Sequence, residues 1–262
     1  MAAFAPMYCA VASRVLIADT DHRTRGLLAT WLQRVGFEYP APETSPTLTS
    51  LRQVSGGLRA EMIRGRTEML RLVASVEPGS AESMLMTLLA MRSADTYQHS
   101  LRVGRNSASL ARALELPIND VAVIRHAALL HDIGKAAVPP RILAFRGRPS
   151  DEEVLALQLH ATVGEEVLST VPELALAAPI VGATHERFDG AGYPNRLSGG
   201  DIPLGARIIS VADVYDAMTS IRPYRRPLTH LEANRELARV AGTQLDPDVV
   251  HAWIRLTETH PC

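Results

Sequence analysis

The sequence has few cysteines and no long uncharged hydrophobic run. It has two cysteines in 262 residues, Cys9 and Cys262, near opposite ends of the chain. They form neither a disulfide framework nor a thiolate cluster for zinc. No uncharged run reaches the about 18 residues of a transmembrane helix, and the apolar start lacks the basic region of a signal peptide. We therefore expect a cytoplasmic chain without a membrane segment.

The chain also lacks an excess of charge of either sign. Its net charge is −1, and its arginines are scattered evenly among the acidic residues. This distribution argues against an extended nucleic-acid-binding surface, although a local basic pocket for a small anion remains open. With 47% hydrophobic residues, the chain can bury a substantial core.

Lysine is almost absent. Of the 27 basic residues, only Lys135 is a lysine. A chain that otherwise uses arginine has kept one compact ammonium group, which indicates a position that needs a point charge rather than a planar fork. The target that fits best is a substrate phosphate; chance placement of a single lysine is the alternative.

Lys135 closes the most informative stretch of the chain, residues 129–135. Here an apolar segment ends in His131 and Asp132, followed by Ile133 and Gly134. Adjacent imidazole and carboxylate groups supply one nitrogen and up to two oxygens, a ligand set suited to Fe, Mn or Zn. Two residues cannot complete such a site, so further ligands must come from elsewhere.

After residue 80, apolar residues recur at helical spacing and strand patterns are nearly absent. Ser150 with Glu153 and Thr229 with Glu232 have the spacing of capping boxes at helix starts. We predict a mainly α bundle over residues 81–262, with helices at about 81–114, 119–133, 151–170, 173–187, 204–219, 230–241 and 247–259.

The first 80 residues follow other patterns. The apolar pattern predicts a strand over residues 14–19 and a helix over residues 21–35. This pair resembles the first strand and helix of a response-regulator receiver domain. We predict a truncated receiver-like or plain βα segment over residues 1–46, including a linker. Residues 47–80 predict a connecting helix, which could pair two protomers or pack on its own domain.

Further candidate ligands are spread over more than a hundred positions. Asp95 and His99 lie one helical turn apart. Asp213 follows an apolar run, where an inward carboxylate is costly unless it is paired or metal-bound. The remaining candidates are His160, in a predicted helix, and His185, which precedes the loop of residues 186–194.

The order and spacing of these residues, with Gly192, Tyr193 and Pro194, resemble the HD-GYP family over residues 84–259. The resemblance implies a helical HD phosphohydrolase that uses two, sometimes three, iron or manganese ions. Members of this bacterial family cut cyclic di-GMP to linear pGpG or GMP.

The resemblance also implies roles for residues of this sequence. Asp132 would bridge two metal ions, and Asp95 stands where a trinuclear subset has an acid. The implied metal ligands are His99, His131, Asp132, His160, His185 and Asp213. The implied phosphate-binding residues are Lys135, Arg222 and Arg225. Gly192, Tyr193 and Pro194 would shape the pocket and contact diguanylate cyclase domains.

Phosphodiester chemistry agrees with such a centre. Uncatalysed hydrolysis of a phosphodiester is very slow. Two cations about 3.5–4 Å apart can lower the pKa of a bridging water and hold the attacking and leaving oxygens in line. Cationic side chains such as Lys135 can then neutralise charge on the other phosphate oxygens.

One residue departs from the family pattern. The family usually has two consecutive histidines before the glutamate, whereas this chain has Thr184, His185 and Glu186. Because a hydroxyl is a weaker ligand than imidazole, we expect one metal ion to be held less tightly. Two alternatives follow: a weak or inactive module that binds nucleotide or a cyclase partner, and a phosphodiesterase for another cyclic dinucleotide.

Overall fold

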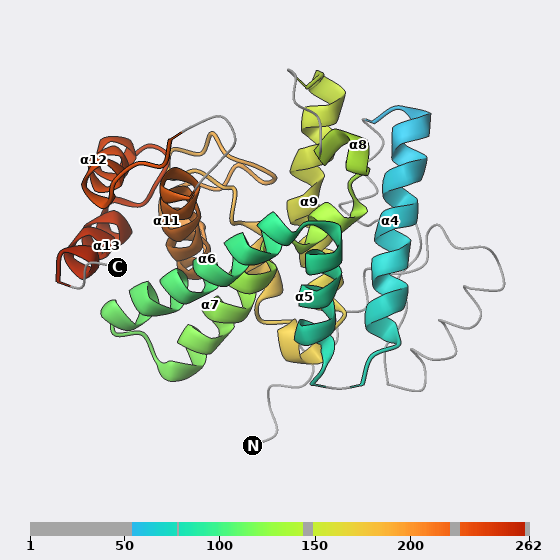
Figure 1. Ribbon diagram of the computed structural model, residues 1–262, viewed down its shortest axis with the longest axis horizontal. Helices are drawn as coiled ribbons and strands as arrows, with labels where there is room; N and C mark the ends of the chain where they lie inside the picture. The colour runs from blue at the N-terminus through green and yellow to red at the C-terminus, as the bar shows by residue number, and fades with distance from the viewer. Residues whose placement is uncertain (1–53, 78, 144–148, 221–225, 260–262) are drawn as a thin grey trace. The chain divides into compact units, whose positions relative to one another are not determined.

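The computed structural model describes residues 54–77, 79–143, 149–220 and 226–259 (Figure 1). Within these ranges every regular element is a helix, apart from an isolated β-bridge between Ala241 and Leu245. The predicted mainly α architecture is confirmed. The predicted βα segment lies outside the described residues. None of the described helices combines the length and apolarity needed to cross a membrane.

The described residues form two compact units, each made of two separate stretches of chain. The first unit contains residues 54–85 and 133–178, and the second contains residues 86–132 and 179–259. Helix α5 (Ala81–Arg92) and the short helix α10 (Ala178–Gly182) each continue from one unit into the other. The division of the chain into residues 1–46, 47–80 and 81–262 stays a prediction.

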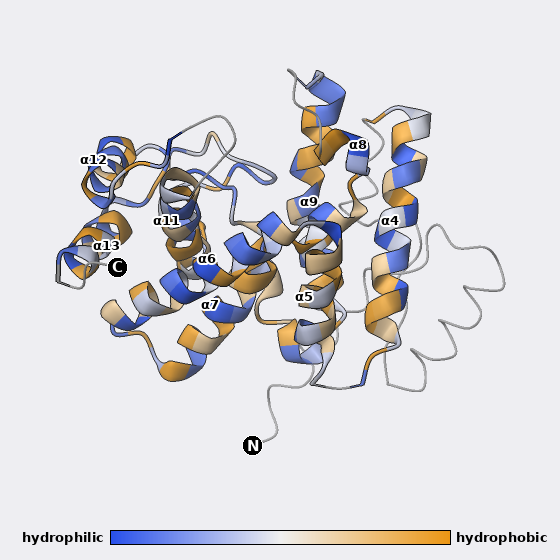
Figure 2. Ribbon diagram, in the orientation of Figure 1, coloured by the Kyte–Doolittle hydropathy of each residue, from blue (hydrophilic) through white to orange (hydrophobic). Residues whose placement is uncertain are grey.

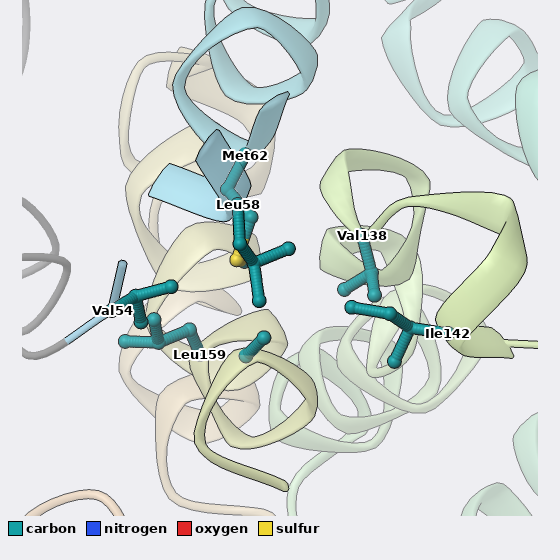
Figure 3. Packing of buried hydrophobic residues seen from close by; sticks show 7 residues of the cluster. Val54, Leu58, Met62, Val138, Ile142 and Leu159 are labelled. Carbon is teal, nitrogen blue, oxygen red and sulfur yellow. The ribbon is translucent and has the colours of Figure 1, made fainter. Parts of the chain in front are cut away.

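The first unit is built from two long helices and three short ones. The long helices are α4 (Gly56–Ala74) and α9 (Asp151–Ser169). The short ones are η1 (Ile133–Ala137), α8 (Pro140–Leu143) and η2 (Pro172–Leu174). Helix α4 contacts both η1 and α9, and α9 contacts η1 and α8. Apolar side chains from these elements and from the residues next to them meet in the core shown in Figure 3: Val54, Leu58, Met62, Val138, Ile142, Ala156 and Leu159.

A buried ion pair joins the two long helices of this unit. The Nε of Arg66 donates to Oε2 of Glu166 at 2.6 Å, and their side chains are 3% and 5% exposed. A pair buried this deeply is expensive to break, because removing one partner leaves an uncompensated charge in the core. Arg66 and Glu166 therefore fix the alignment of α4 on α9.

Gly134 allows η1 to approach α9 closely. A Cβ atom added at Gly134 would lie 1.9 Å from the carbonyl oxygen of His160. No side chain fits at that distance. The glycine that follows the His131-Asp132 pair is thus explained by packing between η1 and the helix that carries His160.

The second unit is a cluster of longer helices. Its helices are α6 (Ala94–Ala113), α7 (Ile118–Leu130), α11 (Leu204–Thr219), α12 (His230–Val240) and α13 (Pro247–Thr259), with the short η3 (Gly199–Asp201). Helix α6 contacts α7, α11 and α13, and α11 also contacts α7, α12 and α13. Trp253 is 1% exposed and packs edge-on against Tyr215 at 4.6 Å between ring centroids. Figure 2 shows both polar and apolar residues along α12 and α13, as expected for helices that bury one side.

Both predicted capping boxes are present. The Ser150 hydroxyl accepts from the N–H of Glu153, whose carboxylate accepts from the N–H of Ser150. Thr229 and Glu232 make the same reciprocal bonds. These contacts account for the agreement between the predicted and observed starts of α9 and α12.

Two predicted helix boundaries are wrong. The helix expected over residues 81–114 is interrupted at Ser93, whose Oγ accepts from the N–H of Thr96 and so starts α6 as a new helix. The helix expected over residues 173–187 is replaced by η2 and α10, followed by turns that lead into the loop after His185. Apolar spacing does not distinguish a continuous helix from short helical turns with the same buried face.

Glu165 makes the stability of the first unit depend on pH. Burial and the neighbouring Glu166 carboxylate raise the pKa of Glu165 to about 7. Because this pKa lies above its unfolded value, the folded protein binds more protons. Glu165 therefore lowers stability as the pH rises from about 4.5 to about 7.

We expect Glu165→Gln to stabilise the protein at pH 8 by on the order of 1–3 kcal/mol relative to the unchanged chain, with little difference near pH 4.5. Chemical denaturation at both pH values measures this change. Glu68→Gln, at a 64% exposed side chain on α4, is the control. A stabilisation by Glu165→Gln that is equal at the two pH values would contradict the assignment.

Candidate metal centre

His131 and Asp132 lie buried at the end of α7, where they are 1% and 3% exposed. The Nδ1–H of His131 donates to the carbonyl oxygen of Ala128 at 2.8 Å. This bond leaves Nε2 as the available ligand atom, and Nε2 lies 3.7 Å from Oδ2 of Asp132. The end of α7 therefore places a nitrogen of His131 next to an oxygen of Asp132.

His99 of α6 meets this pair. Its ring centroid lies 5.3 Å from that of His131, at an interplanar angle of 64°. The Nε2 atom of His99 lies 3.1 Å from Oδ1 of Asp213, on α11. Its Nδ1 donates to Oδ2 of Asp216 at 2.7 Å.

The donor atoms of the second unit converge closely enough to hold a cation. His99, His131 and Asp132 each offer one ligand atom, and these three atoms lie within 4.8 Å of one another. Asp132 and His185 also offer ligand atoms within 4.8 Å of each other. Imidazole and carboxylate donors fit a divalent transition metal, so these residues could bind metal ions, with Asp132 common to both groupings.

The charges around His99 favour a doubly protonated ring in the absence of a cation. Burial by itself would lower the pKa of His99, but hydrogen bonds that its ring donates to Asp213 and Asp216 raise this pKa to about 9. Burial likewise tends to raise the pKa of Asp216, whereas His99 and Arg102 lower it to about 2. The carboxylates of Asp213 and Asp216 therefore favour positive charge on the groups next to them.

The loop after His185 is fixed to the second unit by backbone hydrogen bonds. The buried carboxylate of Glu186 accepts from the N–H groups of Asn195, at 2.7 Å, and Leu197, at 3.1 Å. The N–H of Phe188 donates to the carbonyl of Gln244 at 3.2 Å. Glu186 therefore closes the loop on itself, while Phe188 ties it to the segment between α12 and α13.

Tyr193 lies over His185 in this loop. The two rings stack at a centroid distance of 5.2 Å and an interplanar angle of 14°. Burial, together with the carboxylates of Asp132 and Asp213, raises the pKa of Tyr193 well above its ordinary value. The phenol therefore remains a neutral hydrogen-bond donor beside the candidate metal ligands Asp132 and Asp213.

A cavity of about 310 Å³ opens beside these residues in the second unit. Its wall includes His185 and Asp213 from the metal-binding set, with Gly192 and Tyr193 from the loop. The cavity joins candidate metal ligands to a space in which a small molecule can bind.

The other predicted site residues are exposed, lie in the first unit, or are outside the described residues. Asp95 is exposed in the first turn of α6 and belongs to neither donor group among the described residues. His160 on α9 and Lys135 on η1 lie in the first unit. Pro194 is exposed and follows a cis peptide bond from Tyr193. Arg222 and Arg225 are outside the described residues. The ligand and phosphate-binding roles of all these residues stay predictions.

Thr184 is buried, and both its hydroxyl and its carbonyl group make hydrogen bonds within the protein. Its Oγ1 donates to the carbonyl oxygen of Val181 at 2.9 Å, and its own carbonyl accepts from the hydroxyl of Ser210 at 2.7 Å. The hydroxyl therefore serves the turn after α10.

Sequence reasoning gave no role to Asp216 and Glu186. Asp216 contacts His99 directly, and Glu186 holds the loop that carries Tyr193. The spacing of Asp213 and Asp216, one turn apart on a predicted helix, was the available signal for a second carboxylate on the same face.

Comparison with known proteins places the chain in a family. A model of the HD domain matches residues 83–249. The chain belongs to the HD domain family. The predicted resemblance to the HD-GYP proteins is confirmed over this part of the chain.

Several relatives of this HD domain protein have curated names. A "Cyclic di-GMP phosphodiesterase" of Thermotoga maritima is 40% identical over 175 residues, 66% of this chain and 48% of the relative. A "3'3'-cGAMP-specific phosphodiesterase 2" of Vibrio cholerae serotype O1 is 33% identical over 220 residues, 82% of this chain and 41% of the relative. The chain thus spans less than half the length of either relative.

The fold agrees with a solved structure. The crystal structure of a cyclic GMP-AMP-specific phosphodiesterase of V. cholerae has a TM-score of 0.54 at 21% identity, covering 68% of this chain and 47% of that one. At this level of identity the likeness shows the HD domain fold and no more.

The HD domain loop after His185 requires a glycine at position 192. A Cβ atom added at Gly192 would lie 2.3 Å from the backbone nitrogen of Arg187 and 2.5 Å from Cα of Glu186. We expect Gly192→Ala to destabilise the protein by about 2–4 kcal/mol, because backbone must move to admit the methyl group. Urea unfolding measures the change.

Gly200→Ala is the matched control, since nothing lies within 4 Å of a Cβ atom there. We expect this control to change stability by less than about 0.5 kcal/mol. Equal effects of the two substitutions would contradict the close loop packing described above.

Proposed function

We propose that this HD domain protein is a metal-dependent phosphodiesterase that hydrolyses cyclic di-GMP to pGpG or GMP in bacterial second-messenger signalling. One observation carries the proposal: ligand atoms of His99, His131 and Asp132 lie within 4.8 Å of one another in the unit that contains the cavity. The names of the relatives support the substrate class, since they include phosphodiesterases for cyclic di-GMP and for 3'3'-cGAMP.

The cofactor in this proposal is a pair of Fe or Mn ions. Bound there, such ions would supply Lewis acidity and an activated water for attack on the phosphodiester. Asp132 is suited to bridge them because it takes part in both donor groups. The proposed ligands are His99, His131, Asp132, His160, His185 and Asp213.

The chain's own residues orient these ligands and bind the substrate. The Ala128 carbonyl holds His131 with Nε2 available. Tyr193 lines the cavity, stacks on His185 and can donate a hydrogen bond from its neutral phenol. Lys135, three residues after Asp132, is proposed to neutralise a phosphate oxygen as negative charge develops in the transition state.

A second candidate substrate is 3'3'-cGAMP. The V. cholerae relative whose name specifies it aligns with 82% of this chain. Both substrates have the same cyclic phosphodiester backbone and differ in one base, so the proposed metal chemistry applies to both.

Hydrolysis assays test the proposal. We expect the purified chain, loaded with Mn²⁺ or with Fe²⁺ under anaerobic conditions, to release linear dinucleotide or GMP from cyclic di-GMP. The rate should fall more than about a hundredfold in His131→Ala, which loses a metal ligand. His126→Ala, a histidine of α7 outside both donor groups, is the matched control and should retain the rate.

A parallel assay with 3'3'-cGAMP identifies the preferred base. Binding of cyclic di-GMP without product under anaerobic iron loading would contradict an enzyme and support the alternative of a nucleotide-binding module. Absence of both binding and hydrolysis would contradict both readings.

Thr184 provides an independent test of the ligand set. We expect Thr184→His to bind Mn²⁺ about tenfold more tightly, because an imidazole would replace a hydroxyl that now donates to Val181. Calorimetry measures the affinity. Thermal unfolding is the control for overpacking, since Thr184 is 5% exposed. A folded variant with unchanged affinity would show that position 184 does not face the metal ions.

Three further parts of the proposal concern the setting of the protein. We propose that it acts in the cytoplasm, that the loop of Gly192, Tyr193 and Pro194 contacts diguanylate cyclase domains, and that the connecting helix supports a homodimer. A third metal ion would need Asp95 as a ligand, and Asp95 lies outside the two donor groups found in the described chain.

A further inference from the structure

His99 is held between two carboxylates of one helix. Asp213 and Asp216 lie three residues apart on α11 and therefore face the same side. Nε2 of His99 is 3.1 Å from Asp213, while Nδ1 is 2.7 Å from Asp216. The two ring nitrogens thus have separate partners, and only one of these partners belongs to the proposed ligand set.

Arg102 fixes the second carboxylate. Its Nε donates to Oδ1 of Asp216 at 2.5 Å, and its Nη2 donates to Oδ2 at 3.0 Å. Such a two-point contact sets the plane of the carboxylate as well as its position. Arg102 lies three residues after His99 on α6, so α6 supplies both groups that meet Asp216.

Asp216 is buried, with 4% of its side chain exposed. A carboxylate so placed can accept a hydrogen bond from Nδ1–H of His99 and keep the ring from turning. Histidine ligands of metal ions commonly donate their second N–H to such a partner, which selects the tautomer and the ring orientation.

We propose that Asp216, oriented by Arg102, is a positioning residue that holds the His99 ring with Nε2 directed to the metal ion. The inference deepens the proposed function and depends on it, because it concerns a ligand of that metal centre. Asp216 itself does not bind the metal or the substrate; it acts through His99.

An ordinary buried ion pair between helices is the competing explanation. The same unit contains such a pair: Arg207 Nη1 donates to Oδ2 of Asp246 at 2.5 Å, and Asp246 is also 4% exposed. Asp246 holds the start of α13 by accepting from the N–H of Asp248. It serves as a matched example of a buried carboxylate whose role is structural.

The affinity of the chain for Mn²⁺, measured by calorimetry on metal-free protein, separates the two explanations. We expect Asp216→Asn to weaken Mn²⁺ binding about 10–100-fold. Asp246→Asn should leave Mn²⁺ affinity unchanged, although it lowers the melting temperature. Should Asp216→Asn fail to fold, Arg102→Gln tests the same point, because it removes both bonds that orient Asp216.

A double variant shows whether Asp216 acts through His99. In a His99→Ala background, Asp216→Asn should produce no further loss of Mn²⁺ affinity. An additional loss there, or unchanged affinity in Asp216→Asn alone, would overturn the positioning role and leave the metal centre intact. Failure of the unchanged protein to bind Mn²⁺ would instead overturn the proposed function, and this inference with it.

Discussion

The burial of an imidazole beside a carboxylate at the end of α7 is the constraint on which this structure depends. His131 and Asp132 are almost fully removed from water, and a buried carboxylate is costly unless cations or hydrogen-bond donors surround it. The second unit brings ligand atoms of His99 and His185 within 4.8 Å of one of Asp132. This arrangement is a set of donors for divalent cations, and a cation bound by it would offset the cost of burying the carboxylate.

The surrounding helices determine which atoms of these donors are available. The carbonyl oxygen of Ala128 accepts a hydrogen bond from Nδ1–H of His131, and the carboxylate of Asp216 accepts one from Nδ1–H of His99. Both rings are therefore left with Nε2 as the ligand atom. The loop after His185 contributes in a different way, since Glu186 accepts from its backbone and Tyr193 stacks on the histidine. The candidate ligand side chains are therefore oriented by hydrogen bonds with residues that are not ligands themselves.

Much of this could be predicted from the sequence, because helices and their caps leave local patterns. The starts of α9 and α12 followed from Ser150 and Thr229. The motif around His131 predicted a pair of residues that the structure brings together with His99. Other features depend on tertiary contacts that leave little local trace. Ser93 interrupts a continuous apolar pattern by capping α6, and the role of Asp216 arises only when α11 packs on α6.

The proposed function requires nitrogen and oxygen donors of this chain to hold a pair of metal ions. X-ray absorption spectroscopy of the manganese-loaded protein measures both the donor atoms and the distance between the ions. We expect an imidazole scattering pattern together with a metal–metal vector at about 3.5–4 Å. An isolated ion with an oxygen-only shell, and no imidazole contribution, would contradict it.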